Sequence, residues 1–150
     1  MRINIYVNKH FFLTGIKMDE IEIKELIPPE YKEWDLLVEE AQHSTPFHTS
    51  GWLDIYRDVL SRDLRIYGCF RNSELVGGCP LFVKKFKGAM KIGSSTSNMT
   101  DYCGPLIKES SSSKWRNKVK ENYDVLNSLR EFFCRQGIVS TSNFLQGLRM

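Results

Sequence analysis

The alternation of apolar and polar residues near the beginning of the chain is typical of β-strands. Residues 1–8 place three aliphatic side chains between polar neighbours, and a second alternation runs over residues 21–26. Strand side chains point alternately to the two faces of a sheet, so this period of two predicts two short strands. Pro28-Pro29 ends the second strand, because proline donates no backbone hydrogen bond.

The spacing of apolar residues then changes to that of amphipathic helices. Pro28-Pro29-Glu30 suits the first turn of a helix, and the apolar face that follows consists of Trp34, Leu37, Val38 and Ala41. Pro46 interrupts the pattern, and Thr49 or Ser50 is expected to cap a second helix. The apolar face of that helix is expected to be Trp52, Leu53, Tyr56, Val59 and Leu60.

Two runs rich in β-branched and aromatic residues, 64–70 and 74–86, flank Arg71-Asn72-Ser73. Runs of this kind on either side of a short polar turn predict an antiparallel hairpin. A turn around Gly88 and another short strand over residues 90–95 are expected to follow. Four lysines gather around that turn, namely Lys84, Lys85, Lys87 and Lys91.

A long helix is predicted over residues 115–136, after the polar run at 109–113. Its expected apolar face is Val119, Tyr123, Leu126, Leu129 and Phe133. Gly137 is expected at the position after the helix, where a left-handed backbone favours glycine. Residues 138–145 would form the strand that follows.

This order of elements predicts an α+β fold with two short N-terminal helices, antiparallel strands, one long helix and a following strand. The sheet lacks its second half, so we expect a truncated domain. Met18 is the expected true start, because the strand-and-helix pattern becomes regular only after it. Residues 1–17 are then a doubtful N-terminal extension, and residues 18–150 carry the domain.

Composition excludes several classes of protein. The 150 residues are 41% hydrophobic and 26% charged, which is ordinary for a globular domain. No apolar run is long enough to cross a bilayer or to form a signal-peptide core, so a cytoplasmic location is expected. Four cysteines without CxxC spacing give no metal site, and we expect them to be reduced and mostly buried.

Several short signatures, in order, resemble the FemAB-like branch of the GNAT acyltransferase superfamily, which includes peptidoglycan-bridge aminoacyltransferases and acetyltransferase-like proteins of polysaccharide gene clusters. The resemblance covers residues 31–107, and the helix at 115–136 falls where the family places the helix before its central strand. The matching residues are Trp34-Asp35, Pro46-Phe47-His48-Thr49 with Trp52, Leu75-Val76-Gly77-Gly78 with Pro80-Leu81, and Asp101-Tyr102 with Gly104-Pro105-Leu106.

The resemblance implies the N-terminal half of a domain that transfers an acyl or aminoacyl group to an amine, in cell-wall or polysaccharide synthesis. The donor would be acyl-CoA or aminoacyl-tRNA, and the acceptor a small molecule or a cell-wall precursor. GNAT enzymes hold the donor pyrophosphate in a glycine-rich turn after the central strand, and no Q/R-x-x-G-x-G/A follows residue 145 here. The chain is therefore expected to bind no cofactor and to be inactive on its own.

Candidate substrate-binding residues come from the same signatures, and no catalytic residue is assigned. His48 suits either a general base or a structural hydrogen bond to the backbone. Trp52 and Tyr56 suit either an acceptor pocket or the core. Asp101 and Tyr102 would bind the acceptor or stabilise a turn. The full set is Phe47, His48, Trp52, Tyr56, Arg57, Asp101 and Tyr102.

Arg57 stands beside Tyr56, where the peptidoglycan-precursor transferases place a lysine that helps to hold the substrate diphosphate. A guanidinium can grip phosphate with two hydrogen bonds, but Arg57 is offset by about 100° around the helix from the lysine position. The diphosphate subsite of those transferases is therefore changed in this chain.

The formal charge of +3 does not indicate DNA binding. The lysines near Gly88 and a second group at 114–120 would suit a phosphate-bearing partner such as tRNA, or a solvated surface. An alternative function is a non-catalytic binding module that completes its sheet with a strand from a partner or from a C-terminal half.

Overall fold

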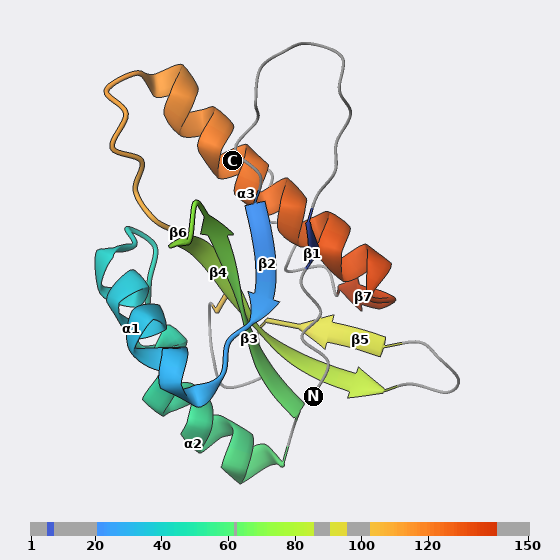
Figure 1. Cartoon of the computed structure of the whole chain (residues 1–150). Helices are drawn as coiled ribbons and strands as arrows, with labels where there is room; N and C mark the ends of the chain where they lie inside the picture. The colour runs from blue at the N-terminus through green and yellow to red at the C-terminus, as the bar shows by residue number, and fades with distance from the viewer. Residues whose placement is uncertain (1–5, 8–20, 62, 86–90, 96–102, 141–150) are drawn as a thin grey trace.

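A curled β-sheet forms the centre of the computed structural model, which describes residues 6–7, 21–61, 63–85, 91–95 and 103–140. Its strands lie in the order β1-β2-β3-β4-β5-β7, and β6 pairs with β4 nearer the beginning of that strand than β5 does. Every pairing is antiparallel except that of β5 with β7 (Figure 1). The strands are β1 (Tyr6–Val7), β2 (Ile21–Glu25), β3 (Asp63–Arg71), β4 (Glu74–Lys85), β5 (Lys91–Ser94), β6 (Leu106–Ile107) and β7 (Ile138–Ser140).

Helices cover both faces of this sheet. Helix α1 (Tyr31–Glu40) follows a short 3-10 turn at Pro28–Glu30, and α2 (Ser50–Leu60) follows another at Pro46–His48. These two helices pack on one face, and α3 (Trp115–Arg135) packs on the other (Figure 1). The α+β fold class predicted from the sequence is therefore confirmed.

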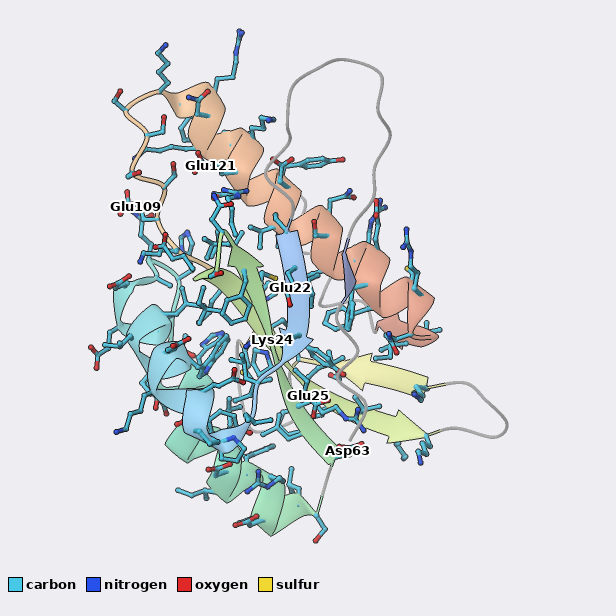
Figure 2. All side chains as sticks on the ribbon, viewed as in Figure 1. Glu22, Lys24, Glu25, Asp63, Glu109 and Glu121 are labelled. Atoms are coloured by element: carbon cyan, nitrogen blue, oxygen red, sulfur yellow. The ribbon has the colours of Figure 1, made fainter. Side chains whose placement is uncertain are left out.

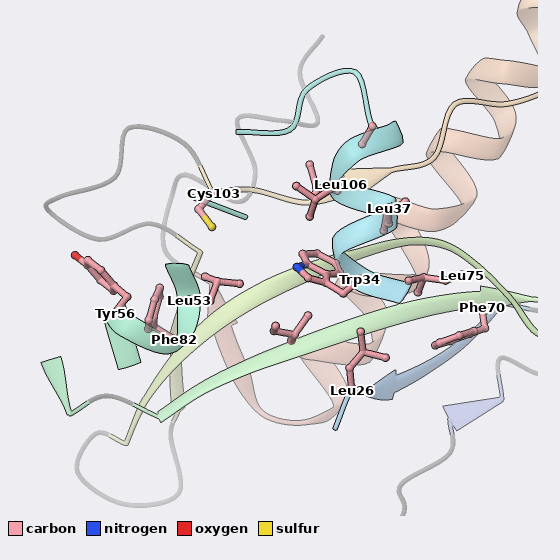
Figure 3. Packing of buried hydrophobic residues seen from close by; sticks show 13 residues of the cluster. Leu26, Trp34, Leu37, Leu53, Tyr56, Phe70, Leu75, Phe82, Cys103 and Leu106 are labelled. Carbon is pink, nitrogen blue, oxygen red and sulfur yellow. The ribbon is translucent and has the colours of Figure 1, made fainter. Parts of the chain in front are cut away.

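The alternation of side chains along β3 builds both layers of the core. Ile66 and Phe70 point to the side of α1 and α2, where Trp34 lies at the centre of the cluster shown in Figure 3. Tyr67 and Cys69 point the other way and pack against α3. Because one strand contributes to two cores, its side chains are buried on both faces over residues 66–70.

The predicted hairpin is confirmed, with β3 and β4 joined by Asn72 and Ser73. Both turn residues have positive φ, of 50° and 66°, as a two-residue hairpin turn that matches the strand twist requires. The predicted strands at 21–26 and 90–95 correspond to β2 and β5. The expected turn around Gly88, with Lys87, lies outside the described residues.

Helix α1 buries the predicted face, but α2 buries a narrower one. Thr49 caps α2, and Leu53 and Tyr56 are buried as expected. Trp52 and Val59 were expected in the core, yet they are 37% and 72% exposed. The helix touches the sheet along one narrow stripe, and both residues lie at the edge of the predicted face that turns away from it.

The predicted face of α3 is only partly confirmed: Leu129 and Phe133 are buried as predicted, but the buried stripe is rotated by about a quarter of a turn from the predicted one. Val119 and Tyr123 are exposed, and all the buried residues lie between 125 and 133. The first turns of α3 extend beyond the end of the sheet, so none of the described helices or strands covers them (Figure 1). Gly137 follows the helix with a φ of 67°, as predicted. Of the strand expected at 138–145, the structure describes residues 138–140, which form β7.

Gly78 on β4 allows α1 to approach the sheet closely. A Cβ atom at this position would lie 2.7 Å from Cζ3 of Trp34 and would overlap the backbone carbonyl oxygen of Tyr67. Trp34 is fully buried. The indole therefore packs directly on the backbone of the central hairpin, and any side chain at residue 78 would displace it.

We expect Gly78→Ala to destabilise the protein by about 2 kcal/mol or more, because overpacking a rigid contact forces the backbone to move. Chemical denaturation followed by circular dichroism measures the change. Gly51→Ala on α2 is the matched control, since a Cβ there meets nothing within 4 Å, and alanine is the better helix former. Equal stability of the Gly78→Ala variant and the native chain would contradict this account.

Candidate functional site

His48 joins three segments of the chain through buried hydrogen bonds. Its carbonyl oxygen accepts a hydrogen bond from Nε1 of Trp34 at 2.6 Å. The Thr45 backbone N–H donates to Nδ1 of the imidazole at 3.1 Å, so the ring proton lies on Nε2. That nitrogen donates to the carbonyl oxygen of Gly104, also at 3.1 Å.

A second set of contacts fixes the beginning of α2. The Asp35 carboxylate accepts hydrogen bonds from the backbone N–H and the hydroxyl of Ser50, at 2.8 and 2.6 Å. Thr49 accepts from the backbone N–H of Trp52 at 3.4 Å. Together these acceptors satisfy N–H groups that a helix leaves unpaired in its first turn, and Asp35 ties α2 to α1.

The imidazole of His48 is held in its neutral form. The residue is 0% exposed, and burial lowers the pKa of the imidazole below its ordinary value, although its bonds to Gly104 and Thr45 oppose the shift. With both ring nitrogens bonded to the protein, the imidazole has no path to a molecule in solvent. The geometry favours the structural role that the sequence offered as one alternative.

Four aromatic side chains form an aromatic row beside this network. The ring centroids of Phe47 and Trp52 lie 5.4 Å apart, those of Trp52 and Tyr56 6.4 Å, and those of Tyr56 and Phe82 5.4 Å. Tyr56 is buried, whereas Trp52 presents about a third of its surface to solvent. Figure 3 shows Tyr56 and Phe82 close together at the end of the cluster.

Phe82 was missing from the residues predicted for the site. The strand period of β4 predicts on which face Phe82 lies, but not which helix packs against that face. The contact with Tyr56 is made between α2 and β4, which are far apart in the sequence. Only the tertiary packing reveals it.

Arg57 lies apart from the aromatic row. Its guanidinium pairs with Asp54 at 3.0 Å and with Asp58 at 3.4 Å. One residue along a helix is a rotation of about 100°, which separates Arg57 from the ring of Tyr56. The structure therefore does not bring this predicted phosphate-binding residue to the other site residues.

Asp101 and Tyr102 lie outside the described residues, but the next residues contact the site. The thiol of Cys103 donates to the carbonyl oxygen of Phe47 at 3.4 Å, and Gly104 is the partner of His48. This segment ends in β6, which pairs with β4 at Gly77 and Gly78.

The buried thiols are unsuited to nucleophilic chemistry. Cys69, Cys79 and Cys103 are buried and unbridged, while Cys134 is exposed. Burial raises the pKa of the Cys103 thiol to about 12 and raises those of Cys69 and Cys79 as well. In the described part of the chain, no three His, Cys, Asp or Glu side chains gather where they could hold a metal ion.

Within the same residues, none of the helices combines the length and the apolar character that crossing a bilayer requires.

Comparison with known proteins gives one structural likeness. No protein-family model matches the sequence, and no curated protein matches it. Among solved structures, the chain is similar to a probable acetyltransferase from Staphylococcus epidermidis ATCC 12228. The sequences are 18% identical, the match covers 85% of this chain and 77% of that one, and the TM-score is 0.43. A likeness this loose does not establish a shared activity.

His48 gives the stability a specific dependence on pH. The lowered pKa means that, below the ordinary value of about 6.5, the unfolded chain binds a proton that the native protein does not. Stability is therefore lost as the pH falls through this value toward the native pKa, with a slope of at most about 1.4 kcal/mol per pH unit. Denaturation of the native chain and of His48→Gln between pH 8 and 5 measures this contribution as the difference in slope.

Glutamine does not titrate, so the His48→Gln variant should lose this part of the pH dependence even if it is less stable throughout. The exposed His43 supplies the control, since His43→Gln removes an imidazole outside the buried network. If His48→Gln and the native chain had parallel profiles, the neutral buried imidazole would be disproved.

Proposed function

We propose that residues 18–150 form the N-terminal part of a GNAT-like acyltransferase domain of the FemAB-like branch. The reaction is transfer of an acyl or aminoacyl group, from acyl-CoA or aminoacyl-tRNA, to an amine of a small molecule or cell-wall precursor. In this proposal the described residues form the acceptor side of the domain.

The observation that carries the proposal is that the family-like signatures contact one another. Trp34 donates to His48, Asp35 binds Ser50, and His48 donates to Gly104. Gly78 lies directly under Trp34. Short signatures that matched by chance would have no reason to meet in one buried region, so their assembly supports a common origin with the family.

The aromatic row suits the recognition of an amine. The face of a tryptophan or tyrosine ring attracts an ammonium group through its quadrupole, most strongly for tryptophan. Trp52 is the member of the row with substantial exposure, and Phe47 holds it edge to face. An alkylammonium acceptor placed on Trp52 would lie beside the segment that begins at Cys103.

The remaining chemistry fits a reaction without an enzyme nucleophile. Attack by an amine on an activated acyl group is accelerated by positioning and by donors for the oxyanion. The buried thiols and the buried neutral imidazole take no part in such a reaction. A Q/R-x-x-G-x-G/A turn for the donor pyrophosphate is absent from the 150 residues, so this stretch by itself is proposed to be inactive.

A second candidate function is a binding module that completes its sheet with a partner strand. β7 pairs with β5 along one edge, and no described strand lies along the other. Val139 on this strand is 56% exposed. An edge strand with unpaired backbone groups is a template for a further strand.

The acceptor proposal is tested by titrating the protein with Nα-acetyl-lysine amide and following backbone amide signals of α2 by NMR. We expect saturable binding that Trp52→Ala weakens by about fivefold or more, because the variant lacks the ring face. Ile55→Ala is the control on the same helix, since Ile55 is 59% exposed and outside the aromatic row. Nα,Nε-diacetyl-lysine amide is the control ligand without the ammonium group.

Equal binding of the two ligands, or no saturable binding at all, would show that the aromatic row is not an acceptor site. A loss of affinity in Ile55→Ala as large as that in Trp52→Ala would lead to the same conclusion.

Light scattering after size-exclusion chromatography distinguishes the second candidate. The acyltransferase proposal predicts the mass of a single chain for both the native protein and Val139→Lys, whose edge charge blocks strand pairing. A native dimer that Val139→Lys converts to monomer would favour sheet completion by a partner strand instead.

A further inference from the structure

A cleft lies at the C-terminal end of α3, on the face of the sheet opposite the aromatic row. It has a volume of about 190 Å³. Sites for drug-sized ligands begin at about 300 Å³, so this cleft has room for a small group and not for a whole cofactor. Its lining residues are Asp63, Arg65, Tyr67, Val83, Lys85, Lys91, Gln136 and Ile138.

Arg65 brings no uncompensated charge to the cleft. Its guanidinium is hydrogen-bonded to both oxygens of Asp63, at 3.2 and 3.1 Å, and it lies 3.4 Å from Glu25. Figure 2 labels Glu25 and Asp63 in this part of the molecule, near the start of β3. The two carboxylates hold the guanidinium in place and together outweigh its charge by one negative unit.

The two lysines of the cleft face each other. Lys85 on β4 and Lys91 on β5 are directly opposite in the antiparallel register, where like charges are destabilising. Among the described residues, neither lysine forms an ion pair with a carboxylate. The two ammonium groups exceed the single net negative charge of Arg65 with Asp63 and Glu25 together with the roughly half negative charge at the end of α3, which leaves the cleft slightly positive.

The floor of the cleft offers hydrogen-bond donors. Tyr67 is buried, with its ring edge to face on Phe132 and Phe133. Burial raises the pKa of its phenol, so the hydroxyl stays protonated at neutral pH. Gln136 supplies an amide at the rim. Ammonium, phenol and amide groups around a small cavity are the donors that an oxyanion requires.

We propose that this cleft binds a phosphate group, held between Lys85 and Lys91. The bound anion would remove the repulsion between the two ammonium groups and accept hydrogen bonds from the floor. The site is independent of the proposed acyl transfer, because it shares no residue with the aromatic row. The phosphate would be inorganic phosphate or the end of a phosphate monoester.

The test is a titration of the 150-residue chain with inorganic phosphate, followed by NMR at constant ionic strength. We expect saturable shifts at amides near Lys85, Lys91 and Gln136. Lys85→Gln and Lys91→Gln should each weaken binding by about tenfold or more, the loss expected for a charge-assisted contact. Lys84→Gln is the matched control, because Lys84 is next in the strand and points to the opposite face.

Thermal unfolding without phosphate provides a second readout. Removing one lysine of a repelling pair should leave the melting temperature unchanged or raise it, so loss of binding in Lys85→Gln would not reflect a damaged fold. A parallel titration with methyl phosphate distinguishes a phosphate monoester from inorganic phosphate as the natural ligand. An affinity for methyl phosphate comparable to that for inorganic phosphate indicates a monoester, and a much weaker one indicates the free ion.

Absence of saturable shifts at tens of millimolar phosphate would overturn the proposal. An equal loss of affinity in Lys84→Gln would also overturn it, because the binding would then reflect the general positive charge of this end of the sheet.

Discussion

The contact between the indole of Trp34 and the backbone of Gly78 determines how the two helices sit on the sheet. The ring lies against β4 where no side chain separates it from the strand, and its N–H is satisfied by the carbonyl oxygen of His48. A large buried side chain with a polar tip contributes most to stability when its ring is closely packed and its polar atom is hydrogen-bonded. For Trp34, the sheet provides the close packing, and the segment leading into α2 provides the hydrogen-bond acceptor.

The same arrangement gives two polar side chains a structural role. His48 and Asp35 are types that often take part in catalysis, yet each joins segments that are distant in sequence. The His48 imidazole is buried, and the Asp35 carboxylate is part-buried against Ser50 at the beginning of α2. Because an unpaired polar group in the interior is costly, these bonds specify one packing of α1, α2 and β6. The same packing holds the aromatic row in place.

The sequence was most informative where one residue type has one structural use. The predicted ends of helices and strands agree with the structure at Pro28-Pro29, at Gly137, and at the turn of Asn72 and Ser73. Apolar periodicity predicted that α2 and α3 exist, but it placed Val59 and Tyr123 in the core, and both are exposed. Periodicity shows that a helix has an apolar side. It does not show how far the covering sheet extends, and that extent determined which residues are buried.

The residues of the candidate site also differ in how far the sequence could predict that they lie together. Phe47, Trp52 and Tyr56 are close in sequence, and helical spacing was enough to group them. Phe82 meets Tyr56 through the packing of α2 on β4, which no local pattern encodes. Lys85 and Lys91 were already grouped around the expected turn at Gly88, and the strand register places them opposite each other. Arg57 was predicted to bind phosphate at the same site, and in the structure its guanidinium pairs with two acidic neighbours on its own helix.

The pairing of β5 with β7 has a consequence for the order in which the protein folds. The β3-β4 hairpin closes over two residues, whereas β5 meets its parallel partner only after the whole of α3 has crossed the sheet. Closing a long loop costs entropy before its contacts form. The hairpin is therefore the natural nucleus, and β7 docks late. Substitutions in β7 should then act mainly on the rate of unfolding, and substitutions in the hairpin on the rate of folding.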